Sequence, residues 1–217
     1  MRRSLAVLGA AALGWSGCAG LRSEPENLDL RKAEIREYQA TAYLPQIAAV
    51  AERAETWLER RVREARPGER LTAVFDLDDT LLSCAPYFNE LNFGYTEASW
   101  RAWIERGDAP ALAPVRELYR TARRLGVDVI VLSARDELQR TATERNLRLA
   151  ECSGYAALLL EPPGWKGTTA EFKTAERRRL AAEGRTIILN IGDQESDLAG
   201  GFAERTFKLP DPFYLIL

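Results

Sequence analysis

A short apolar run that stops at three aspartates constrains the fold of this 217-residue chain more than any other feature. Residues 71–75, Leu-Thr-Ala-Val-Phe, have the composition of a β-strand, and Asp76, Asp78 and Asp79 follow at once. A strand with so few polar residues is typical of a parallel sheet covered by helices on both faces. Active sites in such sheets lie at the carboxyl ends of the strands, so we expect the aspartates to face a functional site.

Strand-like runs and helical stretches alternate along the chain after this point. They are, in order, helical residues 115–125, strand 127–132, helical 137–150, strand 157–160, helical 169–182 and strand 186–191. This order predicts an α/β fold in which a parallel sheet is flanked by helices. Residues 28–65 are also helical in character. Pro45 must end or kink this stretch, and we expect two helices that pack as a hairpin.

Histidine is absent from the whole chain, which limits the chemistry available to it. The absence excludes Ser-His-Asp hydrolases, histidine phosphatases and zinc enzymes with histidine ligands. Catalytic proton transfer then falls to carboxylates, lysine or tyrosine. The formal net charge is -2 and no basic block stands out, so we expect no nucleic-acid polymer as a partner.

Asp76, Asp78 and Asp79 are costly to gather at one strand end. Two unit negative charges about 4 Å apart repel by roughly 4 kcal/mol at an effective dielectric constant of about 20. A divalent cation removes this cost, and Mg²⁺ prefers carboxylate oxygens, water and substrate phosphate as ligands. The alternative interpretation is a solvated turn or a helix cap, where aspartate is also common.

Three later polar clusters follow predicted strands or open a helix. Ser133 ends the second predicted strand, and with the free N–H groups of a helix expected to begin near Asp136 it makes a seat for phosphate. Lys173, one of only four lysines, lies early in the predicted helix 169–182. Asp193 and Asp197 follow the last predicted strand. Taken singly, the first two are a helix cap and a surface lysine; together and in this order, the clusters predict one site for a cation and a phosphate.

The order of these motifs resembles that of the haloacid dehalogenase superfamily. More narrowly, the chain resembles secreted acid phosphatases: the bacterial lipoprotein enzymes (class B or C), the plant enzymes and the vegetative storage proteins. The likeness covers about residues 28–217, and its further segments are 84–87, 146–147, 151–160, 172–177, 192–198 and 207–214. Ser133-Ala134-Arg135 replaces the commoner Thr-Gly-Arg, and Asp79 stands where the family often has Glu. Neither change removes an oxygen that the site needs.

The resemblance implies the haloacid dehalogenase fold: a Rossmann-like parallel sheet with a small helical cap at about residues 84–113 and an N-terminal helical extension. It also implies a Mg²⁺-dependent acid phosphatase that forms an aspartyl-phosphate at Asp76, with Asp78 as general acid and base. The other implied roles are phosphate binding by Ser133, Ala134 and Lys173, electrostatic catalysis by Lys173, Mg²⁺ binding by Asp76, Asp78 and Asp193, and support from Asp197, which orients Lys173 or metal-bound water. For Arg135, phosphate binding and a structural salt bridge both stay open.

Aromatic residues crowd the expected cap and bear on the substrate. They are Tyr87, Phe88, Phe93, Tyr95, Trp100 and Trp103. They either stack on a nucleobase or aryl group, which favours nucleoside monophosphates or aryl phosphates as substrates, or they form the core of the cap. Two other functions stay open: a catalytically weak exported binding or storage protein on the same fold, and a phosphotransferase. The sequence leaves the oligomeric state open, a dimer included.

Residues 1–20 resemble a lipoprotein signal peptide. Two arginines precede a short apolar run, and Cys18 follows Ser-Gly as in a bacterial lipobox, although Trp15 stands where an aliphatic residue is usual. We therefore expect export, a lipid anchor on Cys18 that binds the membrane, a tether at residues 21–27, and a location in the outer membrane or periplasm. Cys84 and Cys152 are either disulfide-bonded or free buried thiols.

Overall fold

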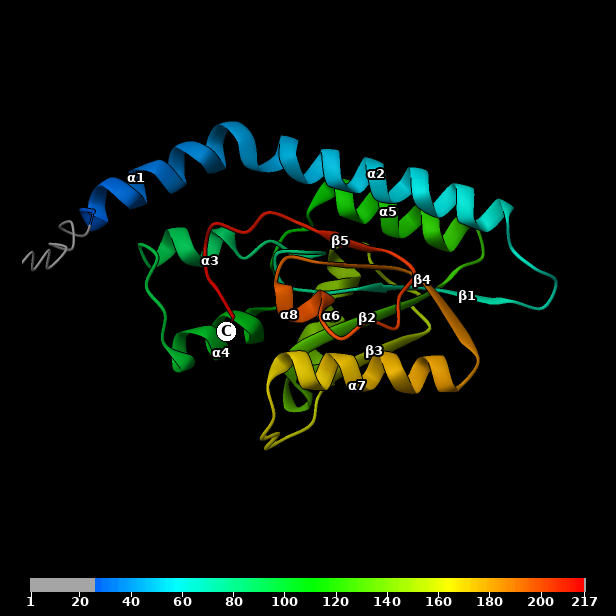
Figure 1. Cartoon of the computed structure of the whole chain (residues 1–217). Coiled ribbons are helices and arrows are strands. Elements are labelled where there is room, and N and C mark those ends of the chain that lie inside the picture. Colours follow the sequence, from blue (N-terminus) through cyan, green and yellow to red (C-terminus); the bar gives the residue numbers. More distant parts are fainter. Residues whose placement is uncertain (1–25, 217) are drawn as a thin grey trace, which may run out of the picture.

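A five-stranded parallel sheet in the order β3-β2-β1-β4-β5 forms the centre of the structure, a computed structural model that describes residues 26–216 (Figure 1). The strands are β1 (Arg70–Phe75), β2 (Asp128–Asp136), β3 (Ala157–Glu161), β4 (Arg185–Gly192) and β5 (Thr206–Lys208). The α-helices are α1 (Leu28–Tyr38), α2 (Leu44–Arg63), α3 (Ala85–Glu90), α4 (Glu97–Arg106), α5 (Ala113–Arg124), α6 (Arg140–Leu149), α7 (Thr169–Ala182) and α8 (Glu195–Leu198). The predicted α/β fold with a parallel sheet is confirmed. The sequence carries no signal for β5, because a strand this short shows no periodicity.

Helices cover both faces of the sheet, as its apolar strands require. α7 packs on one face, against Val74 of β1 and Ile130 of β2. α2, α5 and α6 lie on the other face, where Phe75 and Val131 are buried (Figure 1). β1 and β4 are buried along most of their length, whereas β3 alternates between buried and half-buried residues. This is the expected difference between the middle and the edge of a parallel sheet.

The strand order defines where a ligand can bind. From β1 the chain moves outward through β2 and β3, then crosses back to form β4 on the other side of β1. Doubly wound sheets bind ligands at such a reversal, beyond the carboxyl ends of the strands. Asp76 follows β1 and Asp193 follows β4, so the topology alone brings these two aspartates to neighbouring strand ends.

The N-terminal helices do not form the expected hairpin. α1 and α2 run on as one bent helix through a π-helical turn, η1 (Gln39–Tyr43), and the backbone stays right-handed helical at Tyr38 and Leu44 (Figure 1). Pro45 lies in the first turn of α2, directly after the π-helical turn, so the break in regular α-helical hydrogen bonding falls beside the residue that has no N–H to donate. The π-helical turn absorbs the irregularity without reversing the chain, so the prediction of a hairpin is wrong.

α3 and α4 lie over the carboxyl edge of the sheet, where the sequence predicts a cap (Figure 1). Tyr87, Phe88 and Trp103 are buried, and the ring of Tyr87 contacts the rings of the other two. Part of the aromatic set therefore forms the core of this helical pair. Thr96 caps the start of α4, and Gly107, at φ 59°, ends it in the left-handed conformation that glycine adopts without strain.

Cys84 and Cys152 are buried free thiols, so the second of the two expectations for them is confirmed. No helix in residues 26–216 combines the length and the hydropathy that a membrane span requires. The expected signal peptide, Cys18 and residues 21–25 of the tether lie outside the described residues.

Candidate active site

A tight loop after β1 carries Asp76 and Asp78 past the carboxyl edge of the sheet. The N–H of Asp76 donates to the carbonyl of Ile191 in β4 (2.9 Å), so sheet pairing continues up to this residue. The carbonyl of Leu77 then accepts the N–H of Leu81 (2.9 Å) and closes the loop. The backbone of Asp76 is therefore held by the sheet, which fixes where its carboxylate lies.

Asp79 supports this loop from inside. Its φ of 49° lies in the left-handed region, which aspartate tolerates better than most residues. Its Oδ1 accepts the N–H of Cys84 (2.9 Å) and the hydroxyl of Tyr43 (3.4 Å). Burial, followed by the charge of Asp211, raises the pKa of Asp79 well above its usual range. The third aspartate of the motif thus builds the loop and does not line the pocket described below.

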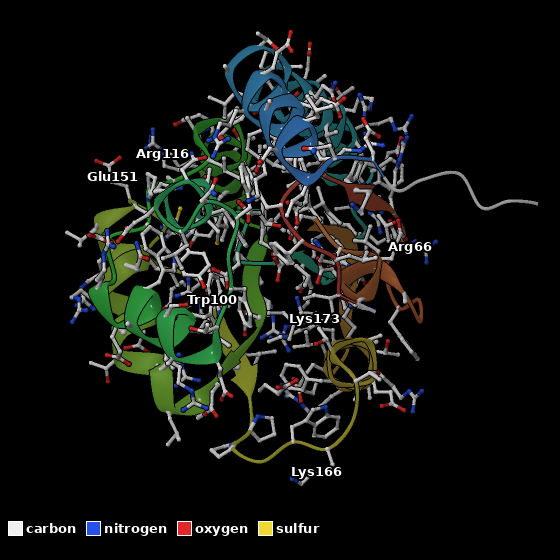
Figure 2. All side chains as sticks on the ribbon, turned by 90° about the vertical axis from the view of Figure 1, so that its left-hand side faces the viewer. Arg66, Trp100, Arg116, Glu151, Lys166 and Lys173 are labelled. Atoms are coloured by element: carbon white, nitrogen blue, oxygen red, sulfur yellow. The ribbon has the colours of Figure 1, made fainter. Side chains whose placement is uncertain are left out.

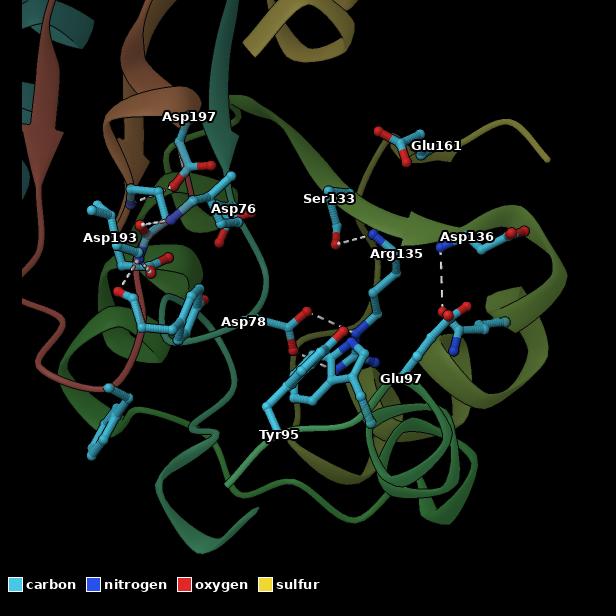
Figure 3. A pocket seen from close by; sticks show the side chains of 18 of the residues that line it. Asp76, Asp78, Tyr95, Glu97, Ser133, Arg135, Asp136, Glu161, Asp193 and Asp197 are labelled. Atoms are coloured by element: carbon cyan, nitrogen blue, oxygen red, sulfur yellow. Dashed lines mark hydrogen bonds and ion pairs between the residues drawn. The ribbon is translucent and has the colours of Figure 1, made fainter. Parts of the chain in front are cut away.

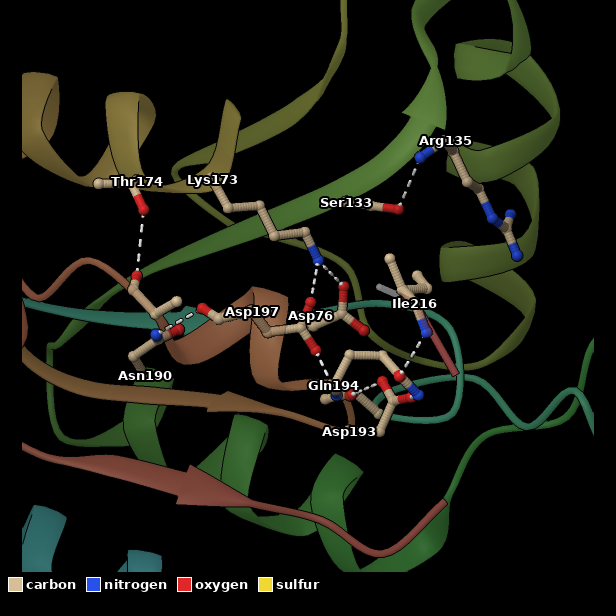
Figure 4. Close-up of polar contacts among 12 residues, drawn as sticks. Asp76, Ser133, Arg135, Lys173, Thr174, Asn190, Asp193, Gln194, Asp197 and Ile216 are labelled. Carbon is tan, nitrogen blue, oxygen red and sulfur yellow. Dashed lines mark hydrogen bonds and ion pairs between the residues drawn. The ribbon is translucent and has the colours of Figure 1, made fainter. Parts of the chain in front are cut away.

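Lys173 of α7 joins the carboxylates of Asp76 and Asp197 (Figure 4). Its ammonium donates to Oδ1 of Asp197 (2.6 Å) and to Oδ1 of Asp76, and the three side chains are only 3%, 3% and 9% exposed. Burial alone lowers the pKa of Lys173, but its two anionic partners outweigh this and raise it above its usual value. The lysine is therefore a fixed positive charge beside Asp76.

Asp197 is held from two sides. While Oδ1 accepts Lys173, Oδ2 accepts the backbone N–H of Gln194 (2.8 Å) at the start of α8. A β-carbon on Gly192 would lie 2.4 Å from Asp197 Oδ2, so only glycine fits at this position. Both oxygens of Asp197 are thus committed to the protein.

Asp193 lies beside this pair and connects it to the C-terminal segment. Its carboxylate accepts the hydroxyl of Thr80 (3.2 Å) and the side-chain amide of Gln194 (2.7 Å). The same amide donates to Asp211 (2.7 Å), and the amide oxygen of Gln194 accepts the N–H of Ile216 (3.1 Å; Figure 4). Gln194 therefore ties the segment after β5 to the site.

The three carboxylates around Lys173 carry more negative charge than this one ammonium offsets. Asp76, Asp193 and Asp197 offer oxygen atoms that lie within 4.8 Å of one another. Burial, followed by the charge of Asp197, raises the pKa of Asp76 well above its usual range and that of Asp193 to about 7. Carboxylate donors suit a hard divalent cation such as Mg²⁺, so the residues fit the expected ion. Asp197 accepts the Lys173 ammonium and a backbone N–H, whereas the donors to Asp193 are a hydroxyl and a side-chain amide, which can turn away, so we expect Asp76 and Asp193 to bind the ion directly.

Ser133 and Ala134 lie in a strand and not at the start of a helix. β2 continues through a bulge to Asp136, which pairs with Glu161 of β3. A short helical turn, η2 (Glu137–Gln139), follows, and α6 begins only at Arg140. The helical segment therefore begins near Asp136, as predicted, with the Asp136 carboxylate capping it by accepting the N–H of Leu138 (2.8 Å), although pairing with β3 extends the strand beyond its apolar part. The hydroxyl oxygen of Ser133 accepts the N–H of Arg135 (3.1 Å), which stabilises the bulge.

Arg135 forms a two-fold ion pair with Asp78 (Figure 3). Its Nε donates to Oδ2 of Asp78 (2.9 Å) and its Nη2 to Oδ1 (2.6 Å). Burial opposes the charge of Arg135, yet the Asp78 carboxylate keeps the pKa of the guanidinium above its usual value. Of the two roles that the sequence leaves open for Arg135, the structure shows the salt bridge.

These side chains share one pocket of about 650 Å³ (Figure 3). Its polar wall includes every predicted site residue that the structure describes: Asp76, Asp78, Ser133, Ala134, Lys173, Asp193 and Asp197. Its aromatic wall comprises Phe88, Phe93, Tyr95, Trp100, Phe213 and Tyr214. The rings of Phe213 and Tyr214 stack on Phe88 at 5.4 and 5.7 Å. Figure 2 looks onto this edge of the molecule. It shows Trp100 of α4 and Lys173 of α7, which both line the pocket.

Sequence reasoning assigns no role to Thr80, Gln194 or Asp211, although all three belong to the site's hydrogen-bond network. Thr80 and Gln194 lie within the motifs that carry the family resemblance, but spacing does not show which side chains they contact. Asp211 lies in the similar segment 207–214, which is the one signal that points to it.

The chain belongs to the haloacid dehalogenase (HAD) superfamily, subfamily IIIB (acid phosphatase), whose family model matches residues 12–217. It is 38% identical over 149 residues to Acid phosphatase 1 of Solanum lycopersicum, an alignment that covers 66% of this chain and 58% of that protein. It is 36% identical over 148 residues to Vegetative storage protein 1 of Arabidopsis thaliana, which covers 66% of this chain and 54% of the relative. The chain thus matches little more than half the length of these relatives.

The fold is also that of a solved structure. The class C acid phosphatase from Bacillus anthracis superimposes with a TM-score of 0.70 over 87% of each chain, at 22% sequence identity. At this identity the likeness concerns the fold. It agrees with the parallel sheet and flanking helices described above.

Proposed function

We propose that this chain is a Mg²⁺-dependent acid phosphatase that hydrolyses phosphate monoesters through an aspartyl-phosphate on Asp76. The observation that carries the proposal is the buried group of Asp76, Lys173 and Asp197 beside Asp193. A nucleophilic carboxylate, a fixed ammonium and oxygen ligands for a divalent ion within one pocket are the parts that phosphoryl transfer requires. Membership of an acid phosphatase subfamily supports the same activity.

In the proposed reaction, a carboxylate oxygen of Asp76 attacks phosphorus. The bond from phosphorus to the leaving alcohol breaks, and its electron pair stays on the alcohol oxygen. Asp78 donates a proton to that oxygen, then accepts one from the water that attacks phosphorus and releases Asp76. The products are the free alcohol and inorganic phosphate.

The remaining residues bind and orient the phosphate. Lys173 offsets its charge and Asp197 holds Lys173 in place, while Ser133 and Ala134 bind phosphate oxygens from the bulge of β2. The carboxylates of Asp76 and Asp193 and the backbone carbonyl of Asp78 would hold Mg²⁺, whose charge would offset repulsion between Asp76 and the phosphate.

We assign residues 84–113 as a cap over this site and a small phosphomonoester as the substrate. The aromatic wall supports nucleoside monophosphates or aryl phosphates, because Phe93, Tyr95 and Trp100 are only partly buried or exposed where they line the pocket. Transfer of the phosphate to an alcohol in place of water is the phosphotransferase alternative. Product analysis with glycerol as acceptor distinguishes the two, since transfer yields glycerol phosphate.

A second candidate function is that of a catalytically weak storage or binding protein. The similarity to Vegetative storage protein 1 favours it. The presence of Asp76, Asp78, Lys173 and Asp193 in one pocket favours the enzyme, since storage requires none of these side chains.

The test is hydrolysis of a panel of nucleotide, sugar and aryl monophosphates with and without Mg²⁺, by the wild type, Asp76→Asn and the control Asp108→Asn. Asp108 is exposed and outside the pocket. We expect Asp76→Asn to lose about 10³-fold or more in kcat and Asp108→Asn to lose nothing. Turnover without metal, or an active Asp76→Asn, refutes the mechanism. If the wild type hydrolyses the panel no faster than Asp76→Asn does, the result supports the storage function.

We also propose that residues 1–20 direct export, that Cys18 carries a lipid anchor to the outer membrane or periplasmic face, and that residues 28–217 form the phosphatase domain. The Ser-Gly-Cys sequence after the apolar run supports this. Labelling with radioactive palmitate in a bacterial host tests it. Incorporation must occur in the wild type and disappear in Cys18→Ser; a wild type without label refutes the anchor.

A further inference from the structure

The carboxylate of Asp78 accepts three hydrogen bonds from side chains of the protein. Arg135 donates to both of its oxygens, at 2.9 Å to Oδ2 and 2.6 Å to Oδ1, and the thiol of Cys84 donates to Oδ1 at 3.4 Å. The side chain of Arg135 is 1% exposed and that of Asp78 is 14% exposed (Figure 3). The guanidinium is therefore inside the protein, and the carboxylate reaches the pocket.

The position of Arg135 is itself fixed from the other side. Its Nη1 donates to the hydroxyl of Thr143 on α6 (3.3 Å), and its backbone lies in the bulge of β2. A bulge changes the direction in which a strand side chain points, and here it accompanies a side chain that leaves the sheet toward Asp78. Arg135 thus connects two separate elements, β2 and α6, to the loop after β1.

The donor count argues against phosphate as the main partner of Arg135. A guanidinium has five N–H donors, and the edge formed by Nε and Nη2, which binds a carboxylate or a phosphate in two-fold fashion, is occupied by Asp78. A phosphate could take this edge only by displacing Asp78. The geometry therefore favours a role for Arg135 that acts through Asp78.

The acceptor count on Asp78 shows what this role is. A carboxylate offers about four lone-pair positions, and three are used: two on Oδ1 and one on Oδ2. One position on Oδ2 remains for a proton. We propose that Arg135 is a positioning residue that holds the carboxyl group of Asp78 so that this single position exchanges the proton with the leaving alcohol. The inference rests on the proposed function of Asp78 as general acid.

The choice of leaving group tests this proposal. A nitrophenolate leaves without a proton, whereas an alkoxide does not, so loss of a well-positioned acid slows only the alkyl ester. We would measure kcat/KM, which reports the steps up to formation of the aspartyl-phosphate, for p-nitrophenyl phosphate and for ethyl phosphate. We expect Arg135→Ala to lose about 10²-fold on ethyl phosphate and less than about 5-fold on p-nitrophenyl phosphate. Arg135→Lys, which can restore one of the two hydrogen bonds, should recover part of the loss.

A double variant shows whether Arg135 acts through Asp78. In the background of Asp78→Asn, Arg135→Ala should cause no further loss on ethyl phosphate, because the group that it positions is already gone. This double variant also leaves no unpaired buried charge, so it remains informative if Arg135→Ala alone does not fold. The matched control is Arg140→Ala, which removes a neighbouring arginine that pairs with Glu137 and does not line the pocket.

Two results would overturn the proposal. The first is an equal loss on both esters together with weaker inhibition by inorganic phosphate, which would make Arg135 a phosphate ligand. The second is an additive loss in the double variant. If instead Asp78→Asn itself slows both esters equally, the proposed function of Asp78 fails, and the inference about Arg135 fails with it. If Asp78→Asn slows the ethyl ester much more than the nitrophenyl ester but Arg135→Ala does not, the inference about Arg135 fails and the proposed function of Asp78 stands.

Discussion

At the scale of single residues, the buried acids Asp76 and Asp197 depend on the ammonium of Lys173. Lys173 pairs with Asp76 and Asp197, and it lies close enough to Asp193 to lower the pKa of that carboxyl group against the effect of burial. Removing one partner of a buried ion pair costs more than the pair contributes, because the other charge is left without compensation. Lys173 is therefore important for stability as well as for binding phosphate.

Lys173→Met should lower the free energy of unfolding by about 3–5 kcal/mol in a chelator at neutral pH. Mg²⁺ should restore more stability to this variant than it adds to the wild type, since the cation then replaces the missing ammonium. Urea unfolding with EDTA and with Mg²⁺ measures both effects. Lys166→Met, at an exposed lysine, is the control. Equal stabilities of the two variants in EDTA would contradict the expectation.

At the scale of elements, a second buried arginine fixes the segment that carries Asp197. Arg177 of α7 is fully buried and donates to the backbone carbonyls of Asp197 (2.6 Å), Gly201 (3.0 Å) and Ala199. Burial lowers the pKa of this guanidinium. It binds carbonyls instead of a carboxylate, so it serves as a clamp between α7 and the chain from α8 to β5.

Arg177→Met should destabilise the protein by about 3 kcal/mol, because hydrogen bonds to a charged group are lost and carbonyls are left buried without donors. Activity should fall as well, since α8 holds Asp197 and through it Lys173. Arg179→Met is the control: Arg179 is half exposed and pairs with Glu176 (2.7 Å) and with Glu183 of its own helix, so its loss should cost less than about 0.5 kcal/mol. Chemical denaturation of the two variants makes the comparison. Similar losses would show that the clamp is not needed.

At the scale of the whole molecule, the buried acids couple stability to pH and to metal. In the metal-free protein, burial raises the pKa of Asp193 to about 7 and that of Asp211 to about 6, whereas an unfolded aspartate titrates near about 3.9. Between these values the folded state keeps protons that the unfolded state has lost. The stability from these groups is complete below about pH 4 and is lost as the pH rises through about 7.

In EDTA we therefore expect Tm to fall between about pH 5 and 7. Glu69, whose pKa is lowered to about 2 by Arg61, contributes a constant amount in this range, because it is ionised in both states. Mg²⁺ binds the deprotonated acids, so the stabilisation that it provides should grow with pH over the same interval. Calorimetry at several pH values, with and without Mg²⁺, gives both trends. Asp193→Asn should flatten the slope in EDTA; a Tm that rises with pH in the wild type would contradict the sign.

Comparison of the chain with its fold shows which parts the sequence could predict. The strands of the central sheet are predicted within a few residues, except β5 and the extension of β2 to Asp136, because their apolar runs record burial directly. The course of the N-terminal helices is not predicted correctly, since a proline indicates an irregularity but not the direction of the chain beyond it. Asp76, Asp193 and Asp197 are found because each follows an apolar strand, and Lys173 because the chain has only four lysines and this one lies early in a helix.

The sequence by itself determined the α/β class, the family and the aspartates and lysine that meet in the pocket, because burial patterns and motif order can be read along the chain. Only the tertiary structure decided how those side chains are used: Asp79 supports a loop, Asp197 is committed at both oxygens, and Asp78 is held by Arg135. Each of these contacts joins residues from separate turns or elements. Their geometry depends on bulges, loops and packing angles that spacing along the chain does not record.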